Sequence, residues 1–211
     1  MHAAQEVGAV DVTINGARVF EHRAFKSISD YASVPATSLR VQVVRTGNAL
    51  ADDPMVMNVA VSLAAQNGYT LILLPNAEQP RSVLLQDDNQ LPGQSAVRFR
   101  FVHLASDIQS VHAIVLSGTE IISSTAFREA SGYAKLEPGQ PLVVWRDAND
   151  AQVSSSHIKL EPDTVYSFFL FADSNRSTIG ISVDAQGVRY LLPTTGGESE
   201  WSETTSPRLP R

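Results

Sequence analysis

His103, Asp107 and His112 lie within ten positions of one another in the segment FVHLASDIQSVH. Two imidazoles and a carboxylate at this spacing could bind a divalent metal ion or act as a general acid–base pair. In the preceding segment VRFRFVH, however, strand alternation places His103 on the apolar face, whereas the same alternation in the next apolar run turns His112 outward. We therefore expect His103 to be a buried imidazole, hydrogen-bonded within the turn that follows it, rather than a metal ligand.

The same phrase occurs a second time, because HAAQEVGAVDV at 2–12 aligns with HLASDIQSVHA at 103–113. The aligned pairs are His2 with His103, Glu6 with Asp107, and Asp11 with His112. With one extra residue in the next turn, the pattern Phe-(Lys/Arg)-x-x-Ser-x-Tyr also recurs. The repeat motif comprises His2, Asp11, Gly16, Phe25 and Tyr31 in the first copy and His103, Asp107, Gly118, Phe127 and Tyr133 in the second.

Two of the three ionisable slots change their residue type between the copies, which favours a structural role for the phrase. We expect Asp11 and His112 to be solvated positions rather than ligands. SHIK at 156–159 has the Ser-x-x-Lys spacing of penicillin-recognising enzymes, but that chemistry needs a helix and the segment is expected to be a strand. We predict no catalytic residues, no metal site and no cofactor. Any ligand held by these turns would meet the candidate binding residues Glu6, Asp11, Asp107 and His112.

Short strand-like runs separated by Gly, Pro, Asn and Asp fill the chain between residues 10 and 184. VDVTI-NG-ARVF at 10–20 is the clearest, because Asn-Gly accepts the positive φ angles of a type I′ hairpin turn. Segments 22–34 and 124–136 lack alternation and are expected to be loops or a short helical turn. The runs YTLILL and YSFFLF are apolar on both faces, which predicts strands covered on both sides. The recurring turns predict two tandem Ig-like antiparallel β-sandwich domains and an all-β fold.

Composition excludes several classes of function. The chain has 211 residues, of which 43% are apolar and 18% charged, as in a folded soluble protein. Cysteine is absent, which excludes a thiol nucleophile, thiolate-bound zinc and disulfides. A net charge of −6 argues against a nucleic-acid partner. We expect no transmembrane segment, and the opening residues do not have the pattern of a signal peptide.

The repeated phrase His-x-Ala-x-(Asp/Glu)-x-x-x-Val, with the later Phe-x-x-x-Ser-x-Tyr, resembles the bacterial family known as domain of unknown function 4397. The first copy keeps Ala3 after its histidine but has Glu6 where the family usually shows Asp, and the second copy has Asp107 but departs at Leu104. Its members are similar to secreted or envelope-anchored β-sandwich modules, often in tandem. The resemblance covers residues 2–192 and implies an extracytoplasmic location, periplasmic or secreted. The motif positions it supports are turn and core residues, so it implies no catalytic residue.

The repeat divides the chain into a first sandwich over 1–90, a second over 91–193 and a disordered tail over 194–211. The strand AVRFRFVH precedes the motif in the second copy, but the first copy begins at its own histidine. The first sandwich is therefore expected to lack its first strand, which would leave backbone groups unpaired at a sheet edge. Self-association through that edge strand is one consequence.

These features favour a non-catalytic binding or spacer module of the bacterial cell envelope, with an unidentified protein or glycan at the cell surface as its partner. One alternative is a structural assembly unit completed by a strand donated from a neighbour. Another is a hydrolase whose residues converge from loops, for which Asp107, His112 and His157 are the candidates. The acidic turns DDP at 52–54 and QDDN at 86–89 leave calcium binding open.

Overall fold

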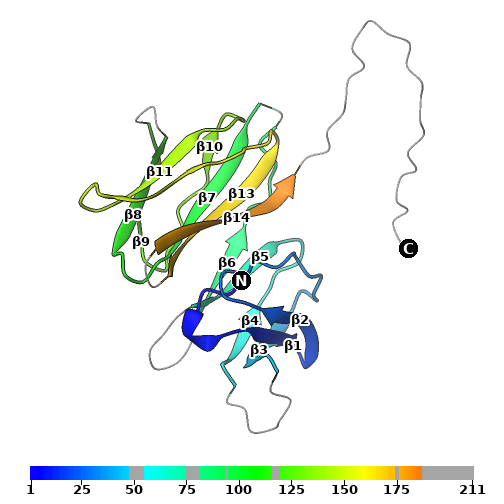
Figure 1. The fold of residues 1–211 in the computed structure, drawn as a ribbon. Helices are drawn as coiled ribbons and strands as arrows, with labels where there is room; N and C mark the ends of the chain where they lie inside the picture. Colours follow the sequence, from blue (N-terminus) through cyan, green and yellow to red (C-terminus); the bar gives the residue numbers. More distant parts are fainter. Residues whose placement is uncertain (48–54, 75–80, 94, 116–118, 174–175, 187–211) are drawn as a thin grey trace, which may run out of the picture.

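The structure, a computed structural model, describes residues 1–47, 55–74, 81–93, 95–115, 119–173 and 176–186 (Figure 1). Apart from a 3-10 turn at Gln5–Val7, all regular secondary structure in these ranges is β-strand. The all-β sandwich class predicted from the sequence is confirmed. Within the same ranges, no helix is long and apolar enough to cross a membrane. The proposed tail at 194–211 lies outside the described residues, and the boundary at 90/91 stays a prediction.

The N-terminal half forms two sheets. Four antiparallel strands in the order β2-β1-β3-β4 make the first, and the hairpin β5-β6 makes the second. Their bounds are β1 Val10–Ile14, β2 Ala17–Arg23, β3 Ser38–Arg45, β4 Met57–Ser62, β5 Gly68–Leu74 and β6 Arg81–Asp87. Asn15 and Gly16 connect β1 to β2 with φ angles of 50° and 83°. Both angles are positive, as the predicted type I′ turn requires.

The C-terminal half forms two four-stranded sheets, in the orders β10-β7-β13-β14 and β12-β11-β8-β9. The bounds are β7 Val97–Leu104, β8 Ser110–Val115, β9 Glu120–Ala126, β10 Ala134–Leu136, β11 Leu142–Asp147, β12 Gln152–His157, β13 Thr164–Asp173 and β14 Arg176–Gln186. Neighbouring strands are antiparallel except β7 and β13, which pair in parallel. The prediction of purely antiparallel sheets is wrong at this pair, because the chain crosses to the other sheet between β7 and β13, and such a crossover permits parallel pairing.

Strands β9 and β10 lie in or overlap the segment 124–136 that the sequence analysis assigned to loop. In β9, Ile122 and Thr125 are buried while the two serines between them are exposed, so its pattern is too polar to be read as a strand. The three residues of β10 are held by pairing with β7, with Ala134 opposite Phe99. These segments therefore form strands because they pair with other strands, and not because of their local β-propensity.

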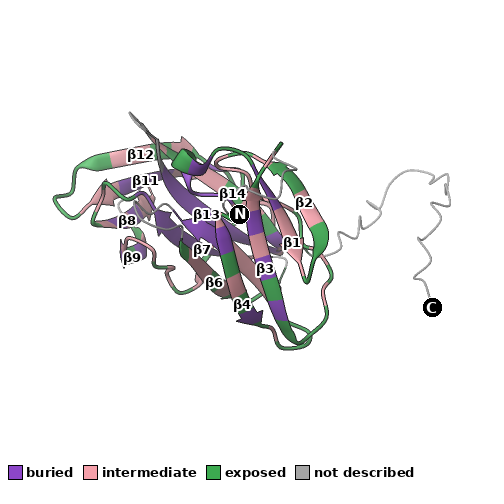
Figure 2. Cartoon of the chain, turned by 90° about the horizontal axis from the view of Figure 1, so that it is seen from below, coloured by how far each residue is buried: buried purple, intermediate pink, exposed green. Residues whose placement is uncertain are grey.

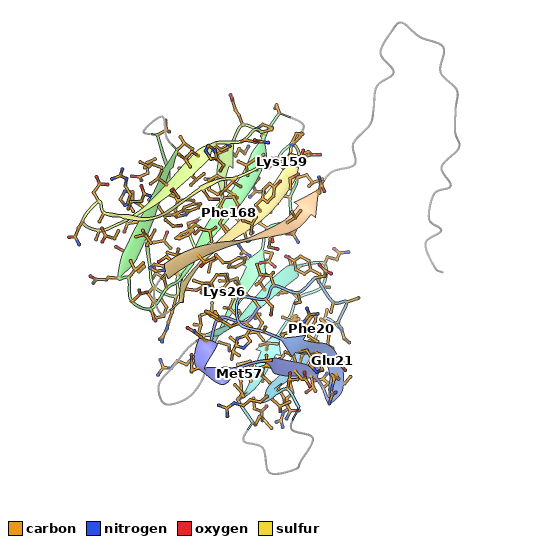
Figure 3. The ribbon with its side chains drawn as sticks, viewed as in Figure 1. Phe20, Glu21, Lys26, Met57, Lys159 and Phe168 are labelled. Carbon is orange, nitrogen blue, oxygen red and sulfur yellow. The ribbon has the colours of Figure 1, made fainter. Side chains whose placement is uncertain are left out.

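The sheets stack in four layers, and β5 and β13 lie in the two inner ones. Leu73 of β5 packs with the β1–β4 sheet, whereas Ile72 on its opposite face packs against Phe169 of β13. On the other face of β13, Phe168 lies in the core of the second sandwich (Figure 3). Figure 2 shows β7 and β13 as largely buried strands through the middle of the molecule. The prediction of strands covered on both sides is confirmed for YSFFLF, whereas in YTLILL only Ile72, Leu73 and Leu74 are buried.

Candidate functional site

The two repeated histidines are buried and are fully engaged by their own turns. Nδ1 of His2 accepts from the Ala4 backbone N–H at 3.2 Å, and its Nε2 lies 2.6 Å from the Gly8 carbonyl oxygen. His103 has the same arrangement. Its Nδ1 accepts from the Ala105 backbone N–H at 3.3 Å, and its Nε2 lies 3.0 Å from the Ile108 carbonyl oxygen. Each imidazole is thus neutral, with its proton on Nε2. Burial lowers the pKa of both rings, and neither ring nitrogen is free to bind a metal.

Asp11 is buried, so the prediction that it is solvated is wrong. Its Oδ1 accepts from the His22 backbone N–H at 2.9 Å and from the Thr46 hydroxyl at 2.7 Å. The register between β1 and β2 shifts beside Asp11, and His22 has a φ of 51°. This irregularity turns the His22 amide toward the carboxylate, which the alternation rule does not anticipate. The hydrogen bond from His22 is the main reason that the pKa of Asp11 is lowered.

The remaining sequence candidates do not converge. Glu6 and Asp107 are exposed on their turns, and Nε2 of His112 lies 3.6 Å from an Asp150 oxygen. His112 pairs opposite Arg146 of β11 and His157 opposite Leu142, which separates the two histidines by about 13 Å along the strand direction alone, at 3.3 Å per residue. They also lie on strands on opposite sides of β11. Within the described ranges, no three His, Asp or Glu side chains are grouped to hold a metal ion.

The phenylalanines of the repeat motif pack against the motif histidines. Phe25 and Phe127 meet His2 and His103 edge to face, with ring centroids 6.5 and 6.0 Å apart. Gly118 lies outside the described residues, as does the acidic turn at 52–54. In the second acidic turn, Asp87 and Asp88 pair with Arg100 and Arg98. Those carboxylates are therefore committed to arginines, and this weakens the calcium alternative at 86–89.

An open cleft of about 560 Å³ lies in the first sandwich. Apolar side chains from both sheets form its walls, among them Val12, Phe20, Val41, Met57 and Leu71. Figure 3 labels Phe20 on β2 and Met57 on β4. Four apolar residues that line it expose a large part of their surface, namely Tyr31 at 48%, Leu84 at 37%, Ile181 at 42% and Val183 at 53%. Its volume falls in the range of ligand-binding pockets, about 300–1,000 Å³.

Met1 and the β5 residues Gly68–Leu71 and Leu73 line the cleft. Figure 1 shows the N-terminus next to β5. In the second sandwich, β7 pairs with β13 over all eight of its residues, with His103 opposite Leu170. In the first, His2 forms a parallel bridge opposite Leu73, so Met1–Ala3 follow the path of the last residues of β7. The Met1 ammonium donates to the Leu71 carbonyl at 3.0 Å. No described strand continues this pairing toward Gly68.

The other wall of the cleft also corresponds to a strand of the second sandwich. When the two copies are aligned with Tyr31 on Tyr133, β10 falls on residues 32–34. These residues form no strand, and Ala32 and Val34 among them line the cleft. Tyr133 next to β10 is covered by two guanidiniums from β7, at 4.9 and 5.4 Å from its ring centroid. Tyr31, its counterpart, remains 48% exposed. The cleft thus occupies the place that β7 takes in the second sandwich.

Two polar atoms at the cleft are buried without a hydrogen-bond partner. They are Nε of Arg23 and Oγ of Ser27, and both residues line the cleft. Burial, followed by the nearby Arg23 guanidinium, lowers the pKa of the Met1 amino group to about 6. Buried polar groups in native proteins are nearly always satisfied, so this end of the cleft offers a donor and a hydroxyl to an incoming acceptor.

A buried polar network joins the two sandwiches next to the cleft. Arg100 of β7 is 3% exposed and binds Asp87, the Gln86 carbonyl at 3.1 Å and Ser167 Oγ at 2.8 Å. Asp87 also accepts from the hydroxyls of Tyr31 at 2.6 Å and Thr70 at 2.9 Å. Ser167 donates to a second carboxylate, and burial raises the pKa of that group, Asp184.

Neither the polar network nor the cleft was predicted from the sequence. Alternation correctly put Arg98 and Arg100 on the face of β7 away from the second core, but that face is covered by the first sandwich. The signal available was the two-sided apolar character of YSFFLF, which implies a covering layer.

Comparison with known families places the chain in one of them. Residues 1–114 match the family described as Domain of unknown function (DUF4397), so the chain belongs to that family. The matched segment contains the whole first sandwich, the strand β7 and most of β8. No curated protein matches the chain.

Proposed function

We propose that this family member is a non-catalytic module of the bacterial cell envelope that binds a partner through the cleft of its first sandwich. The observation that carries the proposal is the contrast between the two sandwiches. The second has a closed core in which Phe99, Phe101 and Trp145 are fully buried, whereas the first leaves an apolar cleft open at the equivalent place. Open apolar concavities of this size are typical of binding sites.

A binding role is better supported than a spacer role. A spacer requires only folded domains and gains nothing from an accessible apolar surface, which carries an aggregation risk. Arg23 Nε and Ser27 Oγ, which are buried at the cleft without a hydrogen-bond partner, could also donate to an acceptor on a bound ligand. A hydrolase is the weaker alternative, because Asp107, His112 and His157 lie on separate turns and strands.

The binding proposal is tested with 1-anilinonaphthalene-8-sulfonate, a dye that fluoresces in apolar sites. Val183→Glu puts a carboxylate at the cleft mouth, whereas Leu91→Glu puts the same charge at a residue of 43% exposure that does not line the cleft. We expect Val183→Glu to weaken dye binding by about tenfold, or about 1.4 kcal/mol, and Leu91→Glu to leave it unchanged. Absent dye binding, or equal binding by the two variants, contradicts the proposal.

The envelope location is proposed from the family resemblance and needs its own test. An antibody against the chain, applied to fractions of the native bacterium, should detect it in the periplasm, the envelope or the medium. Detection in the cytosol alone contradicts the location but leaves the binding cleft unaffected. The non-catalytic role predicts no turnover on a panel of ester, peptide and glycoside substrates. Turnover that is abolished by His112→Ala in a folded protein would instead establish the hydrolase.

A further inference from the structure

We propose that the junction between the two sandwiches is a pH-dependent contact, which takes up one proton on Asp184 and becomes tighter as the solution turns acidic. Asp184 lies in β14 and is buried, as are Asp87 of β6 and Arg100 of β7. The property does not depend on what the cleft binds, so it stands or falls independently of the proposed binding function.

Two buried carboxyl groups share one guanidinium at this junction. Arg100 binds the Asp87 carboxylate directly and donates from Nε to Ser167 Oγ at 2.8 Å. Ser167 in turn donates to Oδ2 of Asp184. When both carboxyl groups are ionised, the set therefore holds one surplus negative charge. A buried charge without full compensation is unfavourable, so the set gains stability by binding one proton.

The hydrogen bonds determine which carboxyl group binds that proton. Asp87 contacts the guanidinium through Oδ1, and its Oδ2 accepts from the hydroxyls of Tyr31 at 2.6 Å and Thr70 at 2.9 Å. Three donors already occupy its two oxygens, and a proton would compete with them. Asp184 reaches the guanidinium only across the intervening serine hydroxyl. Burial raises the pKa of Asp184, and the donors around it offset only part of that rise.

The strand register holds these groups between the two sandwiches. Ser167 of β13 pairs with Arg100 of β7 on one side and with Ser182 of β14 on the other. Asp184 follows two residues after Ser182. Further along β14, Thr178 accepts a hydrogen bond from Lys26 of the first sandwich at 3.2 Å. This face of β14 is therefore turned toward the first sandwich, and Asp184 lies where the two sandwiches meet.

The other titratable groups beside Asp184 change their charge outside the range from pH 4 to pH 8. Burial raises the pKa of the Tyr31 and Tyr133 phenols above their ordinary value of 10. Asp88 pairs with Arg98 at 2.6 Å, and that hydrogen bond holds the pKa of Asp88 below 3.8. The remaining charged groups that face Asp184 are the guanidinium and the second carboxylate described above.

The direction of the pH effect follows from linkage. The pKa of Asp184 in the folded chain lies above its ordinary value of 3.8, so between these two values the folded chain binds more protons than the unfolded chain. Stability from this group is therefore gained as the pH falls through the folded pKa and lost as the pH rises. His2 and His103 act in the opposite direction, because burial lowers their pKa, but substituting Asp184 leaves them unchanged.

The first experiment compares the parent chain with Asp184→Asn, whose neutral amide has nearly the shape of the protonated carboxyl group. Urea unfolding of the full chain is followed by circular dichroism at pH 8 and pH 4. We expect the ratio of the unfolding constants, parent over variant, to fall at least about threefold from pH 8 to pH 4. The matched control Asp88→Asn should give a nearly constant ratio. A constant ratio for Asp184→Asn overturns the proposal.

The second experiment observes the junction itself. Exchange of the Arg100 Nε–H with water is measured by nuclear magnetic resonance and expressed relative to free arginine at the same pH. We expect protection of this group to be at least about threefold higher at pH 5 than at pH 8 in the parent chain, and to be independent of pH in Asp184→Asn. Protection that does not rise in acid means that the proton does not tighten the contact, and this also overturns the proposal.

Discussion

Replacing Asp87 by Asn should destabilise the junction between the two sandwiches by about 3 kcal/mol. The Asp87 carboxylate faces the buried Arg100 guanidinium and accepts from the Tyr31 and Thr70 hydroxyls. The amide has nearly the same shape but no charge, and removing one partner of a buried ion pair costs about 3–5 kcal/mol. We expect the lower end of this range, because Asp184 also lies near Arg100 and retains part of the compensation.

The adjacent residue provides a matched control. Asp88 binds Arg98 at 2.6 Å, but its side chain is half exposed, so Asp88→Asn should cost no more than about 1 kcal/mol. Urea unfolding is followed by the fluorescence of the fully buried Trp145, in a Trp201→Phe background that removes the second tryptophan. The reasoning is refuted if Asp87→Asn lowers the free energy of unfolding by no more than Asp88→Asn does.

Three further substitutions test other parts of the structure by the same urea assay. His103→Ala should cost about 3 kcal/mol at pH 7, because two buried backbone groups lose their partner. That cost should shrink at pH 5, since burial lowers the pKa of His103 below 6.5 and protonation then already destabilises the parent chain. A cost unchanged by pH would argue against a neutral buried ring. Asp11→Asn should be less stable than the parent at pH 6, and the difference should narrow below pH 3.8, because the lowered pKa of Asp11 gives stability that is lost as pH falls. A difference independent of pH contradicts this. Gly180→Ala should cost about 1–3 kcal/mol, because its Cβ would come within 2.8 Å of the Phe171 ring, whereas Gly132→Ala meets no atom within 4 Å. Equal costs would mean that the ring moves away freely.

Local sequence patterns predicted the structure correctly where a feature depends on one short segment. The Asn15–Gly16 pair predicts its hairpin because few other residues accept two positive φ angles. Alternation places His103 in the core, and the apolar character of YSFFLF on both faces predicts that β13 is covered on both sides. Each of these conclusions depends on residues that are adjacent in the chain.

Features that depend on distant partners could not be predicted in this way. Asp11 is buried because a register shift in the β1–β2 pair brings the His22 amide to it. Arg100 is buried because another sandwich covers its face of β7. The cleft required knowledge of how residues 32–34 fold, because they lie beside it without forming a strand. These are outcomes of packing between segments far apart in sequence.

Hydrogen exchange of the cleft-facing amides tests the open edge of β5 most directly. The account predicts fast exchange at Tyr69 and Leu71, and slow exchange at Tyr166 and Phe168, the equivalent residues of β13 that β7 covers. Exchange at these two amides that is as slow as in β13 would contradict the account.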